Sequence, residues 1–288
     1  MKKGILLIAV GHPYYGKMAV ALAATIRVVD KTIPIHLAHS ESAIKYLSKE
    51  ELELFTSMDI VPTAYYDRKK GVQYIRTKMF MYELSPFEQT LFLDCDLLWL
   101  KKQPIELLDE LDGNAISYQN YGFADLSKDV DPDFNMWADV TEVKKVYALS
   151  EGRYYQIHSE VFYFEKGAIA KKYFKTALKV YDNLKVKAKV FAGAVPDELP
   201  FTIASAQLEV FPHKDDFRPS YWTRLGGFKH MYLLSDEYYL ISMAGTNSDS
   251  SVIDNYNILT SAAYHKLGLQ YPYKWKNKKS FLKERKTI

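Results

Sequence analysis

Short apolar runs alternate with stretches of helical periodicity over the first third of the chain. The runs that predict buried strands lie at 4–10, 33–38, 58–63 and 90–93, and the stretches that predict helices lie at 17–29, 41–55 and 75–84. This alternation is typical of a mostly parallel sheet wrapped by helices. We therefore predict an α/β fold, in which the loops after the strands gather at the edge where open sheets bind ligands.

The pattern becomes less regular after residue 111. A turn-rich stretch covers 121–139, and the later elements are predicted as strands at 161–164, 208–211 and 238–243 and as helices at 168–184, 195–206 and 250–267. The helix at 195–206 begins with a loop that carries Asp197 and Glu198, where carboxylates also favour the helix dipole. No internal repeat or low-complexity segment interrupts the chain, so we predict one integrated domain.

Two carboxylates, Asp94 and Asp96, interrupt the apolar run at 91–100. An ionised carboxylate in apolar surroundings is costly unless it is paired, hydrogen-bonded or bound to a cation. In an extended strand these two side chains would point to the same face, which would bring their oxygens together. Hard oxygen ligands suit Mg²⁺ or Mn²⁺, which keep positions open for nucleotide phosphates. We predict a divalent metal here; the alternative is a strand end whose carboxylates accept hydrogen bonds from loop amides.

Composition limits the classes of protein to which the chain can belong. The 288 residues are 48% hydrophobic, enough for a proper core, and the net charge of +3 does not indicate a polyanion partner for the body of the protein. Cys95 is the only cysteine, which excludes an intrachain disulfide and fits a reducing compartment. No run reaches the roughly 20 apolar residues that span a bilayer. We therefore expect a soluble, cytoplasmic protein.

The stretch at 274–286 carries seven basic residues and one acidic residue, with Trp275 and Phe281 between them. It can lie on an anionic membrane surface, which would make the protein peripheral, or it can follow a nucleic-acid backbone. The alternative is a solvated terminal helix.

Several of these segments resemble family 8 of the GT-A nucleotide-sugar glycosyltransferases, the glycogenin-like and lipopolysaccharide-galactosyltransferase-like enzymes. Thr-Leu-Phe-Leu-Asp-Cys-Asp at 90–96 is similar to the family's strand that ends in Asp-x-Asp. Tyr-Ile-Arg-Thr-Lys-Met-Phe at 74–80 lies where the family has a basic helix, and 9–15 lies where its first strand ends in the loop that holds the base. The resemblance covers residues 4 to 250.

The resemblance continues on the acceptor side, with substitutions. Val-Pro-Asp-Glu-Leu-Pro-Phe at 195–201 resembles the family's Asp-Gln motif, with Glu198 in place of the glutamine. Gln-Ile-His-Ser-Glu at 156–160 is similar to the segment that reads Asn-small-Gly in the family, but it carries His158 and Glu160.

The resemblance implies a GT-A fold in a single domain over 1–288, with a nucleotide-binding half at 1–110, an acceptor half at 111–270 and the basic tail at 271–288. It implies transfer of a sugar from a nucleotide diphosphate sugar, most simply a UDP-sugar, to a hydroxyl of a glycan, a lipid-linked glycan or a hydroxymethylated DNA base. The residues expected to serve this reaction are Asp94 and Asp96 on Mn²⁺ or Mg²⁺, Gly11, Tyr14, Tyr15 and Asp94 on the nucleotide, Arg76 and Lys78 on the diphosphate, and Asp197 and Glu198 on the acceptor hydroxyl.

Purely structural roles are alternatives to two of these assignments. Arg76 and Lys78 can be the solvated face of an amphipathic helix, and Asp197 and Glu198 can be ordinary acids of a helix start. If the transfer inverts configuration, one of the two acids can act as the base; the family analogy favours retention.

The third metal ligand departs from the family pattern. The family's strand ends in His-x-x-Gly, whereas Leu-Ile-Ser-Met-Ala-Gly at 240–245 places Ser242 at the histidine position. His265-Lys-Leu-Gly268 has the same spacing but closes a helix, where Gly268 is expected to be a C-cap. Water and the diphosphate can complete the metal shell instead.

Two other functions remain open. A nucleotidyltransferase also joins an α/β fold to carboxylate-held magnesium, but it typically has a glycine-rich basic phosphate loop, and Gly-His-Pro-Tyr-Tyr-Gly at 11–16 is not one. A catalytically weak carbohydrate-binding protein on the same fold is the second alternative, and Ser242 makes it credible.

Overall fold

The computed structural model describes residues 2–68, 71–191, 193–222, 236–243 and 250–271. The chain forms two compact units: one comprises Met1–Leu6, Val61–Phe92 and Leu111–Arg218, and the other Leu7–Ile60, Leu93–Glu110 and Pro219–Ile288. We call them the hairpin unit and the α1 unit after their main elements. The basic stretch at 274–286 lies outside the described residues.

A six-stranded sheet has the order β3-β2-β1-β6-β9-β8. Its strands are β1 (Lys3–Ala9), β2 (Ile35–His39), β3 (Ser57–Ile60), β6 (Gln89–Leu93), β8 (Ile116–Asp125) and β9 (Arg153–Glu165). β2 and β3 pair in parallel, whereas β8 and β9 pair antiparallel. The mostly parallel α/β architecture predicted from the alternating pattern is confirmed.

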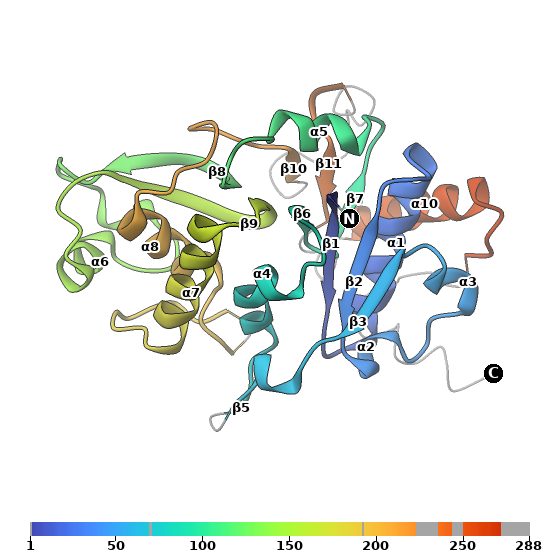
Figure 1. The fold of residues 1–288 in the computed structure, drawn as a ribbon, viewed down its shortest axis with the longest axis horizontal. Coiled ribbons are helices and arrows are strands. Elements are labelled where there is room, and N and C mark those ends of the chain that lie inside the picture. The colour runs from blue at the N-terminus through green and yellow to red at the C-terminus, as the bar shows by residue number, and fades with distance from the viewer. Residues whose placement is uncertain (1, 69–70, 192, 223–235, 244–249, 272–288) are drawn as a thin grey trace. The chain divides into compact units, whose positions relative to one another are not determined.

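Each of the remaining described elements belongs to one of the two units (Figure 1). In the α1 unit they are α1 (Pro13–Val29), α2 (Glu41–Ile44), α3 (Lys49–Leu52), β7 (Leu97–Trp99), α5 (Pro104–Glu110), β10 (Ser220–Trp222), β11 (Leu240–Ser242) and α10 (Ser250–Lys266). In the hairpin unit they are η1 (Thr63–Tyr65), β4 (Asp67–Arg68), β5 (Gly71–Val72), η2 (Tyr74–Phe80), α4 (Met81–Leu84), η3 (Pro132–Phe134), α6 (Val140–Tyr147), α7 (Ala168–Asp182) and α8 (Glu198–Leu208).

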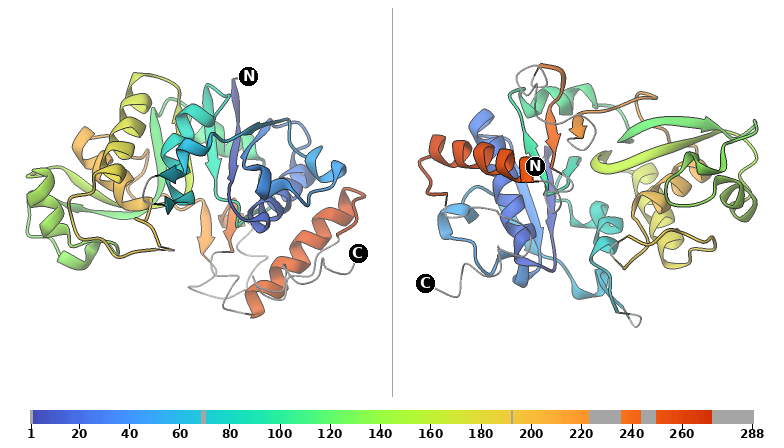
Figure 2. Two further views of the ribbon diagram at one scale, coloured as in Figure 1. Left: turned by 90° about the horizontal axis from the view of Figure 1, so that it is seen from below. Right: turned by 180° about the vertical axis from the view of Figure 1, so that it is seen from behind.

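Helix α1 is the centre of its unit. Its residues from Tyr14 to Arg27 are nearly all buried, and α10 packs across it (Figure 2). Gly16 allows α1 to approach α2 closely, because a Cβ at that position would lie 2.1 Å from the carbonyl oxygen of Ala43. The helix begins at Pro13, four residues earlier than the sequence predicts, since the ring of His12 accepts a hydrogen bond from the amide of Tyr14 and Pro suits the first helical position.

The predicted helix at 41–55 is wrong, because two short helices, α2 and α3, occupy this stretch. Ser48 starts the second one through a capping box with Glu51. The same Glu51 accepts from Lys17 at 2.9 Å and from the hydroxyl of Tyr264 at 3.0 Å, which ties α3 to α1 and α10 through a buried ion pair.

In the hairpin unit, α7 and α8 pack on β9 through aromatic rings. The ring of Phe162 in β9 lies 4.9 Å from that of Phe201 in α8 and 5.9 Å from that of Phe174 in α7. Tyr118, Tyr154, Tyr155, Tyr163 and Tyr173 are among the largest fully buried side chains, so many tyrosines of this unit belong to its core.

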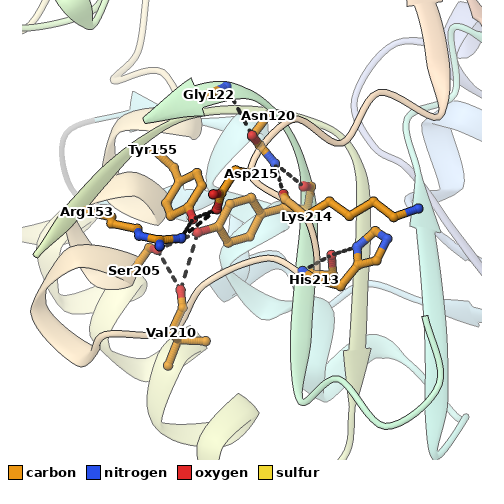
Figure 3. A network of polar contacts seen from close by, with 11 residues as sticks. Asn120, Gly122, Arg153, Tyr155, Ser205, Val210, His213, Lys214 and Asp215 are labelled. Carbon is orange, nitrogen blue, oxygen red and sulfur yellow. Dashed lines mark hydrogen bonds and ion pairs between the residues drawn. The ribbon is translucent and has the colours of Figure 1, made fainter. Parts of the chain in front are cut away.

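The predicted strand at 208–211 is also wrong. α8 continues to Leu208, and Glu209 adopts a left-handed conformation with φ of 51°, which turns the chain out of the helix. The hydroxyl of Ser205 then donates to the carbonyl of Val210 at 2.7 Å. The segment that follows is held to β8 and β9: Asn120 donates to the carbonyl of Lys214, and Asp215 accepts from Arg153 and Tyr155 (Figure 3).

Three further predictions change in detail. The predicted helix at 75–84 is a 3₁₀ helix, η2, followed by one α-helical turn, α4. The stretch at 121–139 begins inside β8, and the predicted strand at 161–164 is the end of the 13-residue β9. No helix in the described part of the chain is both long and apolar enough to cross a membrane.

Candidate functional site

Asp94 and Asp96 lie in a turn at the end of β6. The strand ends at Leu93, and the amide of Leu97 donates to the carbonyl of Asp94 at 3.3 Å. The extended geometry expected for this pair is therefore wrong, and strand alternation does not bring the two carboxylates together. The turn is held in place by the amide of Met243, which donates to the carbonyl of Asp96 at 2.9 Å, and by Cys95 Sγ, which donates to the carbonyl of Ile8 at 3.2 Å.

Two phenol groups of the α1 unit lie near enough to this carboxylate turn for its charge to affect their pKa. Burial raises the pKa of Tyr14, and the charge of Asp96 raises it further. Burial also raises the pKa of Tyr256 in α10, and Tyr271 and then Asp96 raise it further. The rings of Tyr14 and Tyr15 lie 4.2 Å apart, and Tyr15 is the more exposed of the two. The predicted residues Tyr14 and Asp96 are thus near one another.

The loop after β1 is fixed to the loop after β2. Gly11 has a φ of 86°, a conformation that favours glycine, and its amide donates to Ser40 Oγ at 2.9 Å. Ser42 Oγ donates to the carbonyl of Gly11 at 2.6 Å. Gly11, Tyr14, Tyr15, Asp94 and Asp96 all belong to the α1 unit, where the ends of β1, β2 and β6 place them.

The metal expected at Asp94 and Asp96 stays a prediction. Among the residues that the structure describes, no group of three or more His, Cys, Asp or Glu side chains can hold a metal ion. Ser242 pairs in register with Leu97, so β11 ends beside the turn, and residues 244–249 lie outside the described chain. Carboxylate oxygens are ligands that suit Mg²⁺ or Mn²⁺, and phosphate oxygens can fill further positions around such an ion.

His265 lies in the last turn of α10, and Gly268 follows with a φ of 71°. The amide of Gly268 donates to the carbonyl of His265 at 3.0 Å, and that of Leu269 to the carbonyl of Tyr264 at 2.9 Å. The predicted role of Gly268 as a C-cap is confirmed.

Arg76 is buried in contacts that hold the hairpin unit together. Its Nε and Nη2 donate to the two carboxylate oxygens of Asp182, each at 2.8 Å, and its Nη1 donates to the carbonyls of Ala64 and Tyr65. This bidentate pair joins η2 to α7. These contacts give Arg76 a structural role, and it is not part of a solvated helix face.

Lys78 and Asp197 form an ion pair, 2.9 Å from Nζ to Oδ2. Ser159 in β9 donates to the same carboxylate oxygen at 2.6 Å and lies 3.3 Å from Lys78 Nζ. Burial raises the pKa of Asp197, but the lysine and the hydrogen bonds outweigh it and hold the pKa below its usual value. The structure thus joins a residue predicted for the diphosphate to one predicted for the acceptor, and Asp197 is ionised at neutral pH.

Glu198, the next residue, has the opposite environment. Burial raises its pKa to about 7; His158 counteracts this, while the charge of Asp197 adds to it. The indole N–H of Trp137 donates to Oε2 of Glu198, and His158 Nε2 lies 3.7 Å from Oε1. Two adjacent acids with pKa values moved apart are the pattern from which acid and base roles arise.

His158 lies between two carboxyl groups. Its Nδ1 is 3.4 Å from Glu160 Oε2 and 3.1 Å from Gln119 Nε2, and its ring meets that of Tyr121 edge-on at 5.6 Å. Sequence reasoning identified His158 and Glu160 only as departures from a family pattern. It missed Trp137, Ser159 and Gln119, since a single tryptophan in a turn-rich stretch and two buried polar residues on strands give no local signal.

No protein-family model matches this sequence, and no curated protein sequence matches it. The structure resembles many solved protein chains, and the following three enzymes are among them. It superposes on the bifunctional glycosyltransferase WbbM with a TM-score of 0.57 and 15% identity, covering 92% of this chain and 52% of that one. For the galactosyltransferase LgtC, solved with donor and acceptor sugar analogues, the TM-score is 0.53 at 11% identity, covering 89% and 95%. For mouse xyloside xylosyltransferase 1 it is 0.50 at 13%, covering 84% and 97%.

These likenesses establish the fold: the chain has the α/β fold of these glycosyltransferases. It spans about half the length of WbbM, with 52% of that chain covered.

Proposed function

We propose that this protein is a metal-dependent glycosyltransferase that moves a sugar from a nucleotide diphosphate sugar to an acceptor hydroxyl. The observation that carries the proposal is the carboxylate turn Asp94-Cys95-Asp96 at the end of β6, with Tyr14 nearby, in a glycosyltransferase fold. We take the donor to be a UDP-sugar and the metal to be Mn²⁺ or Mg²⁺. The acceptor in this proposal is a hydroxyl of a glycan, a lipid-linked glycan or a hydroxymethylated DNA base.

The donor part of the reaction needs a group that stabilises the leaving diphosphate. A divalent ion held by Asp94 and Asp96 supplies that stabilisation as a Lewis acid. We assign the nucleotide to the hydrogen-bonded loop at Gly11 and to the half-buried ring of Tyr15. Lys78 is better placed in the acceptor group than on the diphosphate, because it pairs with Asp197.

The acceptor part of the reaction is assigned to Asp197 and Glu198. Asp197, ionised and held by Lys78 and Ser159, can accept a hydrogen bond from an acceptor hydroxyl. Glu198 has its pKa raised to about 7, so it can bind or release a proton near neutral pH. One ionised acid that binds the hydroxyl and one acid that exchanges a proton near neutral pH favour a transferase over a protein that only binds carbohydrate.

Hydrolysis of the donor tests the proposal. Purified protein with Mn²⁺ is expected to release sugar slowly from at least one UDP-sugar, and Asp96→Ala is expected to abolish the release. Asp254→Asn is the matched control, since Asp254 is an exposed carboxylate on α10 in the same unit, and it should retain the wild-type rate. Equal rates in wild type and Asp96→Ala would contradict the role of the carboxylate turn.

A further inference from the structure

A row of side chains in the hairpin unit links β9, α8 and the segment before α6. Along this row Glu160 Oε2 lies 3.4 Å from His158 Nδ1, and His158 Nε2 lies 3.7 Å from Glu198 Oε1. The row ends at the indole N–H of Trp137, which donates to Glu198 Oε2. The side chains of His158, Glu160 and Glu198 are 12%, 7% and 11% exposed, so water screens these contacts little.

Trp137 determines which oxygen of Glu198 can carry a proton. An indole N–H is a donor only, so Oε2 has to accept from it. A proton on Glu198 therefore belongs on Oε1, and Oε1 is the oxygen that faces the imidazole. Both oxygens of this carboxyl group thus have a defined neighbour and a defined role.

The other side of the imidazole offers a partner for each state of Nδ1. When Nδ1 carries a proton it can donate to Glu160, 3.4 Å away, and when it lacks one it can accept from the Gln119 amide, 3.1 Å away. With the proton on Nδ1 and held by Glu160, the neutral ring turns a lone pair at Nε2 toward Glu198 Oε1. A carboxylate that fixes a histidine tautomer in this way also stabilises the imidazolium.

We propose that His158 is a positioning residue which, oriented by Glu160, shares one proton with Glu198, so that Glu198 can act as the base toward the acceptor hydroxyl. This inference rests on the proposed function. In the reaction the acceptor oxygen bonds to the sugar carbon as the bond from that carbon to the diphosphate breaks. The diphosphate leaves with the bonding electron pair, and the acceptor's proton passes to Oε1 and from there to Nε2.

The other charged groups around Glu198 support the sharing of one proton between Glu198 and His158. Asp197 is held ionised by Lys78, and its negative charge favours a proton on Glu198. Burial is the main cause that raises the pKa of Tyr121 in β8 to about 12, and the charges of Glu160, Glu198 and Arg218 also affect it. Tyr121 therefore stays protonated throughout the neutral range. Glu198 and His158 are therefore the pair that exchanges a proton near pH 7.

The Trp137 indole gives a readout that needs no substrate. Its N–H bonds directly to Glu198, so its ¹H–¹⁵N resonance, assigned with Trp137→Phe, should titrate as Glu198 ionises, with a midpoint near pH 7 in the wild type. His158→Gln removes the imidazolium that favours ionised Glu198 and should move the midpoint upward by about one pH unit. Glu160→Gln, a second variant in case the first does not fold, should move it in the same direction.

His213→Gln is the control, because His213 contacts Ser117 instead of the carboxyl row, and its midpoint should equal that of the wild type. A midpoint that His158→Gln and Glu160→Gln both leave unchanged overturns the inference. If the protein turns over a donor, the rate of transfer should fall at low pH as Glu198 becomes protonated. In His158→Gln and Glu160→Gln, the pH of this fall should move in the same direction as the midpoint of the Trp137 resonance. Absence of turnover in every protein would instead overturn the proposed function, so the two failures can be told apart.

Discussion

Asp197 and Glu198 are consecutive in the chain, but their carboxyl groups have different neighbours. The first meets a lysine and a serine hydroxyl, whereas the second meets an indole, an imidazole and the charge of the first. The local sequence contains two acids at a helix start and nothing that distinguishes them. Their different ionisation is a product of β9, η2 and the Trp137 segment, which approach from elsewhere in the sequence.

Glu198 should make the stability of the protein depend on pH in a defined direction. Its pKa is raised from 4.5 to about 7 in the folded state, so the folded protein binds more protons than the unfolded chain between these values and loses stability as the pH rises. Glu198→Gln removes the effect. Relative to wild type, the variant should gain about 3 kcal/mol of unfolding free energy between pH 4 and pH 8. Urea unfolding at both pH values measures this, and a constant difference would contradict the raised pKa.

The pair of Lys78 and Asp197 should contribute stability at neutral pH. Lys78→Met removes the cation beside a mostly buried carboxylate that keeps its hydrogen bonds from Ser159 and a backbone amide, which should cost about 3 kcal/mol of unfolding free energy at pH 7. Because the pKa of Asp197 is lowered in the folded protein, this stabilisation is present above the ordinary range of aspartate and is lost as the pH falls through the folded value.

Lys128→Met is the matched control for that measurement. Lys128 pairs with Asp125 at 3.2 Å, but its side chain is 75% exposed, so its removal should change the unfolding free energy by less than about 1 kcal/mol. Urea denaturation measures the unfolding free energy of both variants. Equal losses of unfolding free energy would show that the buried pair stabilises the protein no more than the exposed pair does.

At the scale of elements, local patterns predicted β1, β2, β6, α7, α8, β11 and α10 close to their bounds. They failed where tertiary contacts determine the secondary structure. A single helix at 41–55 is broken because Ser48 and Glu51 begin a new one, and Glu51 is held there by Lys17. The strand expected at 208–211 is replaced by a helix end, because Glu209 adopts the left-handed conformation and Ser205 satisfies the next carbonyl.

The approach of α1 to α2 gives a prediction at this scale. Gly16→Ala would improve helix propensity by about 1 kcal/mol, yet its Cβ would lie 2.1 Å from the Ala43 carbonyl oxygen. We expect a net loss of about 2 kcal/mol, since backbone has to move. Gly167→Ala, where a Cβ would meet nothing within 4 Å, is the control and should cost less than about 1 kcal/mol. Thermal unfolding compares the two, and equal melting temperatures would contradict the close contact.

At the scale of the whole molecule, the alternating pattern was sufficient to predict a mostly parallel sheet, and the fold it predicts is the one observed. The candidate site was predictable only in part. The sequence pointed to Asp94, Asp96, Lys78, Asp197 and Glu198 one by one, because each belongs to a short motif. It could not pair Lys78 with Asp197, place Arg76 on Asp182, or join Trp137 to Glu198, since these contacts link residues 119, 106 and 61 positions apart in the chain.

Melting temperature with nucleotide sugars tests the central claim, that this fold carries a metal-dependent site for a nucleotide sugar. A ligand that binds the folded state alone stabilises it by about 2.7 kcal/mol at a concentration one hundred times its Kd. At least one UDP-sugar together with Mn²⁺ is expected to raise the melting temperature more than either alone, and Asp96→Ala is expected to lose this gain. If no UDP-, GDP- or TDP-sugar changes the melting temperature, with or without metal, the account is contradicted.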